Sequence, residues 1–113
     1  MNTHHKIILE ILQNHKGKDN AIKIKDLLVK VNYNLNGNRI KERKLREIKA
    51  ELNVLYGQYI CSSHQNGYWI AITSDEIKQT KDFLYSYIEH ISREAKAIED
   101  NFYKQGTTQL SLI

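Results

Sequence analysis

Residues 39–73 read RIKERKLREIKAELNVLYGQYICSSHQNGYWIAIT, and the hydrophobic period changes within this stretch. The first half repeats apolar residues every three or four positions, which predicts a helix from about Asn38 to Asn53 that ends before Gly57. The second half is rich in aromatic and β-branched residues, which predicts two strands, Gln58 to Ser62 and Gly67 to Ile72. Asn66 and Gly67 favour a tight turn, so the strands are expected to form a hairpin. The expected core-facing side of the helix carries Ile40 or Leu45, followed by Ile48, Leu52 and Leu55.

Two further helices are expected upstream of this stretch. HHKIILEILQNHKG carries apolar residues at helical spacing and predicts a helix from about His4 to His15, with Thr3 as its N-cap. A very short strand at Ala21 and Ile22 comes next. An amphipathic helix then follows, and residues 33–38 (YNLNGN) form a turn. The apolar positions of this second helix are Ile24, Leu27, Leu28 and Val31.

A long helix is expected downstream, from Ser74 to about Tyr103, with two acids in its first turn that complement the helix dipole. Its apolar residues recur at alternating intervals of four and three, and only Lys81 interrupts them. A repeat of seven residues is typical of a coiled coil. The repeated positions are Ile77, Leu84, Ile88, Ile91, Ala95, Ile98 and Phe102.

Composition places the chain among ordinary globular proteins. Its 113 residues are 41% hydrophobic and 27% charged, with one cysteine, Cys61. A single cysteine forms no internal disulfide, and no apolar run approaches the length of a membrane span or a signal-peptide core. We therefore expect a cytoplasmic protein. The net charge of +4 is concentrated between Lys23 and Lys49, where nine Lys and Arg residues stand against three acids.

The order helix, short strand, helix, turn, helix, strand, hairpin, strand resembles that of the winged helix-turn-helix proteins, over about Thr3 to Thr73. The resemblance rests on the order and length of the elements, and any small α+β domain with three helices and a hairpin is the alternative. It implies an α+β fold in three parts: a winged-helix domain at 1–73, a long helix at 74–103 and a flexible tail at 104–113.

The resemblance also implies duplex DNA as a partner, because the last of the three helices enters the major groove in such proteins. Arginine there can bind guanine or clamp a phosphate. Arg39, Arg43 and Arg46 are expected to form one row on the helix. The alternative is a solvated helix with ion pairs such as Glu42–Arg46. The expected DNA contacts are Asn36, Asn38, Arg39, Lys41, Arg43, Lys44, Arg46 and Lys49, assisted by His64, Gln65 and Asn66 in a hairpin tip that has no Lys or Arg.

The seven-residue repeat of the long helix predicts a partner helix, and we expect a homodimer that would present two recognition helices to two half-sites. The alternative is a helix that folds back across its own core.

The last five residues, Gln109, Leu110, Ser111, Leu112 and Ile113, resemble the peptide with which bacterial polymerases and mismatch-repair proteins bind the DNA polymerase sliding clamp. That pattern reads Gln-Leu-Ser/Asp-Leu-Phe, and Ile113 replaces its phenylalanine. The resemblance implies a replication-associated or regulatory factor of phage or mobile-element type. A tail strand on a sheet edge and an apolar end buried in a dimer are the alternatives.

No catalytic or metal-binding spacing is present, so we expect neither an enzyme nor a cofactor. His4 and His5 are expected to be solvated. A protein–protein adaptor that uses the same fold without DNA affinity remains the second hypothesis.

Overall fold

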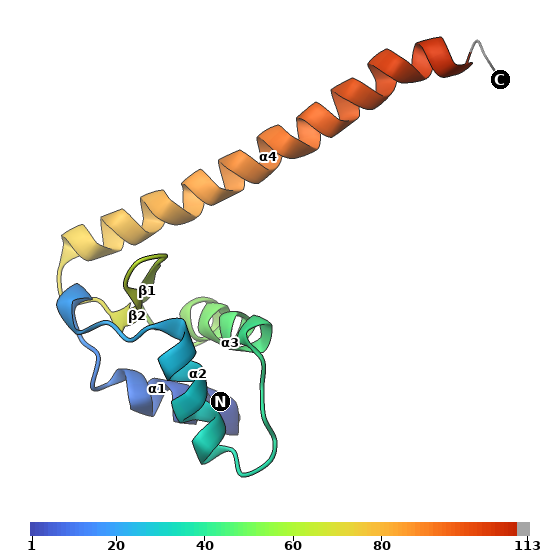
Figure 1. The fold of residues 1–113 in the computed structure, drawn as a ribbon. Helices are drawn as coiled ribbons and strands as arrows, with labels where there is room; N and C mark the ends of the chain where they lie inside the picture. The colour runs from blue at the N-terminus through green and yellow to red at the C-terminus, as the bar shows by residue number, and fades with distance from the viewer. Residues whose placement is uncertain (111–113) are drawn as a thin grey trace. The chain divides into compact units, whose positions relative to one another are not determined.

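The computed structural model describes residues 1–110, and it confirms the α+β class: three helices, an antiparallel hairpin and a long C-terminal helix (Figure 1). The chain divides into two units, Met1–Thr80 and the part that begins at Lys81, so that α4 starts in the first unit and continues into the second. The elements are α1 (Thr3–Leu12), the 3-10 helix η1 (Lys18–Asn20), α2 (Ile24–Asn34), α3 (Glu42–Leu55), β1 (Ile60–Ser63), β2 (Gly67–Ile70) and α4 (Ser74–Leu110).

The core of the first unit lies among α1, α2, α3 and the hairpin. Each helix supplies apolar residues three or four positions apart, because these share one face. Full burial of such a side chain contributes about 1.5–3 kcal/mol. Leu55 was expected in this core but is 67% exposed, since it lies at the last residue of α3, beyond the contact with the other helices. The most buried helical residues are Ile8, Leu12, Leu27, Val31, Leu45, Ile48 and Leu52.

The strand β2 is the centre of a small sheet. On one side it pairs antiparallel with β1, with Ile60 opposite Ile70 and Ser63 opposite Gly67. On the other side Ile22 and Tyr68 exchange two backbone hydrogen bonds of 2.9 Å. The very short strand expected at Ala21 and Ile22 is therefore present as a single bridge at Ile22.

Two asparagine side chains fix where the chain leaves a helix and enters the next element. Asn32 on α2 accepts a hydrogen bond from the N–H of Ile40 (2.8 Å) and donates one to its carbonyl (3.0 Å). Asn53 on α3 does the same to Ile60, at 2.8 and 3.0 Å. A carboxamide carries one acceptor and one donor side by side, which matches a peptide N–H and C=O. We call these two contacts the asparagine clamps.

The start of α4 is joined to β2 through one carboxylate. Glu76 Oε1 accepts from the indole Nε1–H of Trp69 (2.8 Å) and from the backbone N–H of Ile72 (3.3 Å). Thr73 caps the helix, because its hydroxyl accepts from the Glu76 N–H and donates to Glu76 Oε2, both at 3.2 Å. Thr73 is therefore the N-cap residue, and α4 begins at Ser74 as expected.

The helical backbone of α4 extends to Leu110 rather than ending near Tyr103. The sequence pattern suggested a break at Gly106, but glycine costs a helix only about 1 kcal/mol and the backbone bonds continue through it. Of the clamp-type peptide, residues 111–113 lie outside the described residues. None of the helices within residues 1–110 is long and apolar enough to cross a membrane.

Candidate nucleic-acid interface

The helix α3 begins at Glu42, four residues later than the sequence predicted. Arg39 therefore precedes the helix and Lys41 is its N-cap residue, so the expected row of Arg39, Arg43 and Arg46 is wrong. The cause is the first asparagine clamp, which holds the backbone of Ile40 against α2 in a non-helical segment. Asn36 (φ 45°) and Gly37 (φ 99°) reverse the chain just before it.

The exposed face of α3 carries two arginines one turn apart. The side chain of Arg43 is 93% exposed and that of Arg46 is 62% exposed. Both make ion pairs along the helix, Arg46 with Glu42 at 2.5 Å and Arg43 with Glu47 at 3.8 Å. Exposed pairs of this kind contribute only about 0.2–1 kcal/mol, so a phosphate or a base can replace the carboxylate.

Lys44 and Lys49 differ in their surroundings although both lie on α3. Lys44 is exposed, with its Nζ 3.8 Å from Glu47. Lys49 is partly buried, and its Nζ lies 5.2 Å from the centre of the Tyr68 ring on β2. Burial lowers the pKa of Lys49, and the nearby charge of Arg46 lowers it further. Lys49 thus packs α3 against the hairpin instead of extending into solvent like Arg43.

Tyr68 forms the junction between α3 and the hairpin. It is almost fully buried, and burial raises the pKa of its phenol, while the Arg46 guanidinium acts in the opposite direction. Arg46 therefore lies beside the hairpin as well as on the exposed face of α3. Arg46 thus connects the exposed face of α3 with β2.

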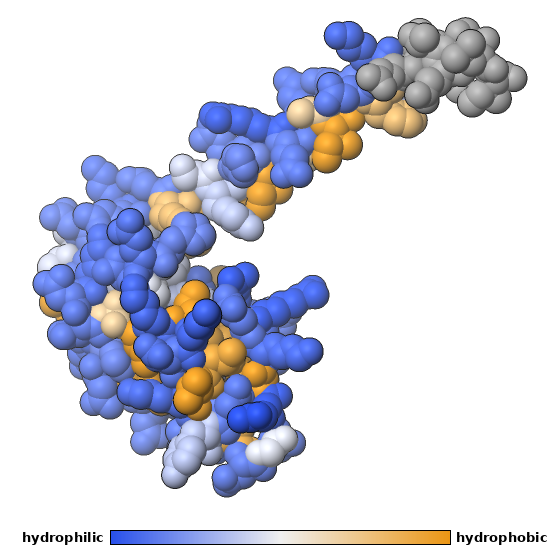
Figure 2. All heavy atoms as spheres, in the orientation of Figure 1, coloured by the Kyte–Doolittle hydropathy of each residue, from blue (hydrophilic) through white to orange (hydrophobic). Residues whose placement is uncertain are grey.

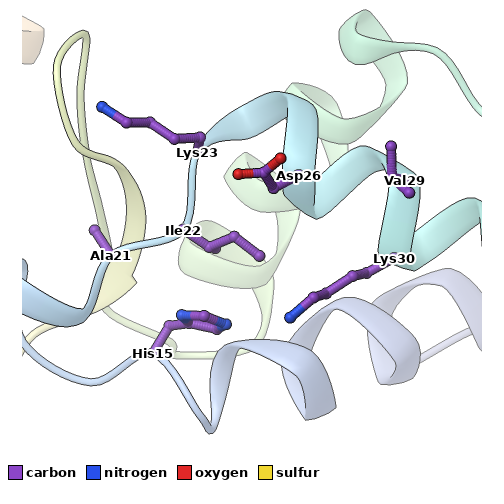
Figure 3. A pocket seen from close by; sticks show the side chains of 7 residues that line it. All are labelled: His15, Ala21, Ile22, Lys23, Asp26, Val29 and Lys30. Atoms are coloured by element: carbon purple, nitrogen blue, oxygen red, sulfur yellow. The ribbon is translucent and has the colours of Figure 1, made fainter.

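The hairpin tip holds the three residues that the sequence singled out. His64 and Gln65 are exposed, and Asn66 is tied back by its N–H, which donates to Ser63 Oγ at 3.0 Å. The tip was expected to carry no positive charge, yet Lys23 donates from its Nζ to the carbonyl of Gln65. Figure 3 shows the Lys23 side chain extending from the start of α2 toward the hairpin.

Sequence reasoning missed Lys23 because 42 positions separate it from Gln65 along the chain. The available signal was the short strand at Ala21 and Ile22, since its pairing with the hairpin places the next residue beside the tip. Lys23 also lines an open pocket of about 420 Å³ at the first turns of α2, together with His15, Ala21, Ile22, Asp26, Val29 and Lys30 (Figure 3).

Cys61 and His5, whose side chains could carry out chemistry, are both buried in the first unit. Cys61 is buried, and burial raises the pKa of its thiol, which disfavours the reactive thiolate. His5 was expected in solvent but is buried, and its Nδ1 accepts from the Asn2 N–H (3.1 Å) while its Nε2 lies 2.7 Å from Glu51. The Asn2 side chain accepts from the His5 N–H (3.0 Å), so Asn2 rather than Thr3 caps α1. Within residues 1–110 no group of three or more His, Cys, Asp or Glu side chains is arranged to hold a metal ion.

On α4 the predicted apolar positions are exposed, and Figure 2 shows apolar residues gathered along one side of the helix. We call the set Ile77, Leu84, Ile88, Ile91, Ala95, Ile98 and Phe102 the α4 stripe.

Comparison with models of known protein families, with curated proteins and with solved structures found no match.

Proposed function

We propose that this chain is a winged-helix protein that binds duplex DNA as a dimer, in a replication-associated or regulatory role of phage or mobile-element type. The observation that carries the DNA-binding proposal is the exposure of Arg43 and Arg46 on α3, a helix that packs on the hairpin, together with the bond from Lys23 to the hairpin tip. Exposed cations on a helix, with a further cation beside the tip of a hairpin, match the two points at which such a fold reaches DNA.

In the proposed complex, the first turns of α3 enter the major groove. Arg43 and Arg46 exchange their carboxylate partners for guanine edges or phosphates, which either guanidinium can bind through two parallel hydrogen bonds. Arg39, Lys41 and Asn38, in the segment before α3, contact the phosphates at the groove edge. Lys44 reaches a phosphate from the next position on the helix.

The hairpin tip acts as the wing. Lys23 supplies its positive charge, while His64 and Gln65 supply hydrogen-bonding groups to the sugar–phosphate backbone or the minor groove. Lys49 supports α3 from behind through its contact with Tyr68. Its role is to hold the angle between the recognition helix and the wing.

The test is fluorescence anisotropy with a short labelled DNA duplex, over about 50–200 mM salt. Arg43→Glu with Arg46→Glu is expected to weaken binding at least about 30-fold, because each lost arginine contact is worth about 1–3 kcal/mol. The wild-type affinity is expected to fall steeply with salt, and the slope is expected to be smaller in the double variant.

Arg93→Glu with Lys96→Glu is the matched control, since it makes the same change in net charge at residues of the second unit that are not part of the proposed interface. This control is expected to bind DNA within about threefold of the wild type. Equal losses in both double variants would mean that only net charge matters and would reject the interface.

The adaptor is the second candidate function, and a specific observation favours it. Val54, Leu55 and Tyr59 are all more than half exposed around the end of α3, and exposed apolar groups of this kind are typical of protein contacts. DNA binding that is undetectable at low salt would favour the adaptor.

We further propose, on the sequence of residues 109–113 alone, that the C-terminal peptide binds the bacterial sliding clamp. Burial of its aliphatic side chains in an apolar cleft is sufficient for a micromolar contact. Purified clamp is expected to bind the full chain and not a chain that lacks residues 109–113. Equal binding of both chains would show that this peptide is not the ligand.

A further inference from the structure

The α4 stripe follows one side of a continuous helix and is exposed along its length. The exposed fractions of the Leu84, Ile88 and Ile91 side chains lie between 41% and 57%, and Ile98 and Phe102 exceed 60%. From Ile77 to Phe102 the stripe extends about 38 Å at 1.5 Å per residue. A partner helix that covers it must present apolar residues at the same spacing, as a second α4 does.

We propose that α4 pairs with the α4 of a second copy in antiparallel orientation. This inference rests on the dimer in the proposed function and adds the direction of pairing. In a two-helix seam the residues that flank the apolar positions meet flanking residues of the partner, and their charges decide the direction. The charges on α4 distinguish the two directions.

In a parallel pair each seam residue faces its own copy. Lys81, which interrupts the stripe, would then lie opposite Lys81 of the second copy within the seam. The flanking positions that meet in this direction are five residues apart, which places Glu94 beside Glu99 of the second copy, twice per dimer. Like charges thus meet both in the seam and at its edge.

In an antiparallel pair of full overlap, Ile88 lies opposite Ile91 of the second copy. Lys81 then faces Ile98 of the second copy, so that the two Lys81 ammonium groups lie apart, and the small Ala95 faces the larger Leu84. At the edge, Lys78 meets Glu99 of the second copy, twice per dimer. In this register no two like charges meet among the flanking positions of residues 77–102.

A shift of the antiparallel register by one heptad is less favourable. In one direction it leaves the stripe beyond Ala95 uncovered, and in the other it places Glu94 opposite Glu94 of the second copy. The register centred between Ile88 and Ile91 covers the longest stretch and is the one that the charges favour.

Glu99→Lys tests the direction, because its effect has opposite signs in the two arrangements. In the antiparallel pair it places a lysine beside Lys78 and is expected to weaken dimerisation of the full chain at least about fivefold. In a parallel pair it would place a lysine beside Glu94 and strengthen the dimer. The measurement is sedimentation equilibrium, with the helix content of each variant checked by circular dichroism.

Asp100→Lys is the matched control. It makes the same change in charge at the next residue, which points away from the seam, and is expected to leave the dimer unchanged. Lys78→Glu in the Glu99→Lys background restores the opposite charges and is expected to restore wild-type dimerisation.

A stronger Glu99→Lys dimer, or a Glu99→Lys variant that behaves like Asp100→Lys, would overturn the antiparallel pairing. A wild-type chain that remains monomeric at micromolar concentration would overturn it as well, together with the dimer in the proposed function. DNA binding is read separately by the anisotropy assay, so a failure of the α4 pairing is distinguishable from a failure of the DNA interface.

Discussion

Gly67→Ala is expected to destabilise the protein by about 3 kcal/mol or more, although it adds only one methyl group. Gly67 has φ 94°, a conformation that alanine rarely adopts. A Cβ at this position would lie 2.0 Å from the carbonyl oxygen of Ile22 and 2.8 Å from Cα of Lys23. Both obstacles are backbone atoms held by the bridge between Ile22 and Tyr68, so no side-chain rotation relieves the overlap.

Gly37→Ala is the control for Gly67→Ala, because it separates the clash from the backbone conformation. Gly37 has a similar φ of 99°, but nothing lies within 4 Å of its added Cβ. The Gly37→Ala variant is therefore expected to lose only about 1 kcal/mol of its free energy of unfolding. Urea denaturation of the two variants measures the difference, and equal losses would show that the close approach of Gly67 to Ile22 does not constrain the fold.

Trp69→Ala is expected to destabilise the protein by about 3–5 kcal/mol, a large part of the stability of a domain of this size. The side chain is 1% exposed and lies between the hairpin and the start of α4. Its removal leaves a large cavity and also deprives Glu76 of the indole hydrogen bond of 2.8 Å.

Trp69→Phe separates these two contributions. Phenylalanine keeps much of the packing but donates no hydrogen bond, so the expected loss is about 1–3 kcal/mol. Thermal denaturation followed by circular dichroism measures both variants. A phenylalanine variant as unstable as the alanine variant would show that the contact with Glu76, rather than the volume of the ring, dominates at this position.

The helices and the hairpin were predictable from sequence because their patterns are local. Leu45, Ile48 and Leu52 recur at helical spacing and are buried as expected. The hairpin also forms as expected, with its turn at residues 64–66 and with Gly67 as the first residue of β2. The place of Gly67 next to the hairpin turn could be predicted from its neighbours. Its close approach to Ile22 depends on a pairing across the sheet, which no local pattern contains.

The errors in the candidate site have the same origin. The start of α3 depends on a clamp from Asn32, eight residues before Ile40, and helical periodicity gives no sign of such a contact. The sequence predicts that Lys49 is solvent-exposed like the other cations of α3, because its position on the helix is close to theirs. Only the position of the Tyr68 ring in the fold shows that Lys49 packs against the hairpin. The place of Lys23 beside the hairpin tip also follows from tertiary structure, so no local pattern predicts it.

The contact between Trp69 and Glu76 gives the protein an internal optical probe. The chain contains one tryptophan, so its ultraviolet emission reports on a single site. That indole is shielded from water and bonded to a carboxylate in the first turn of α4. A separation of this turn from the hairpin would admit water to the ring and shift its emission to longer wavelength. A local separation of α4 from the hairpin is thus observable without a label. It can be distinguished from the melting of the helices.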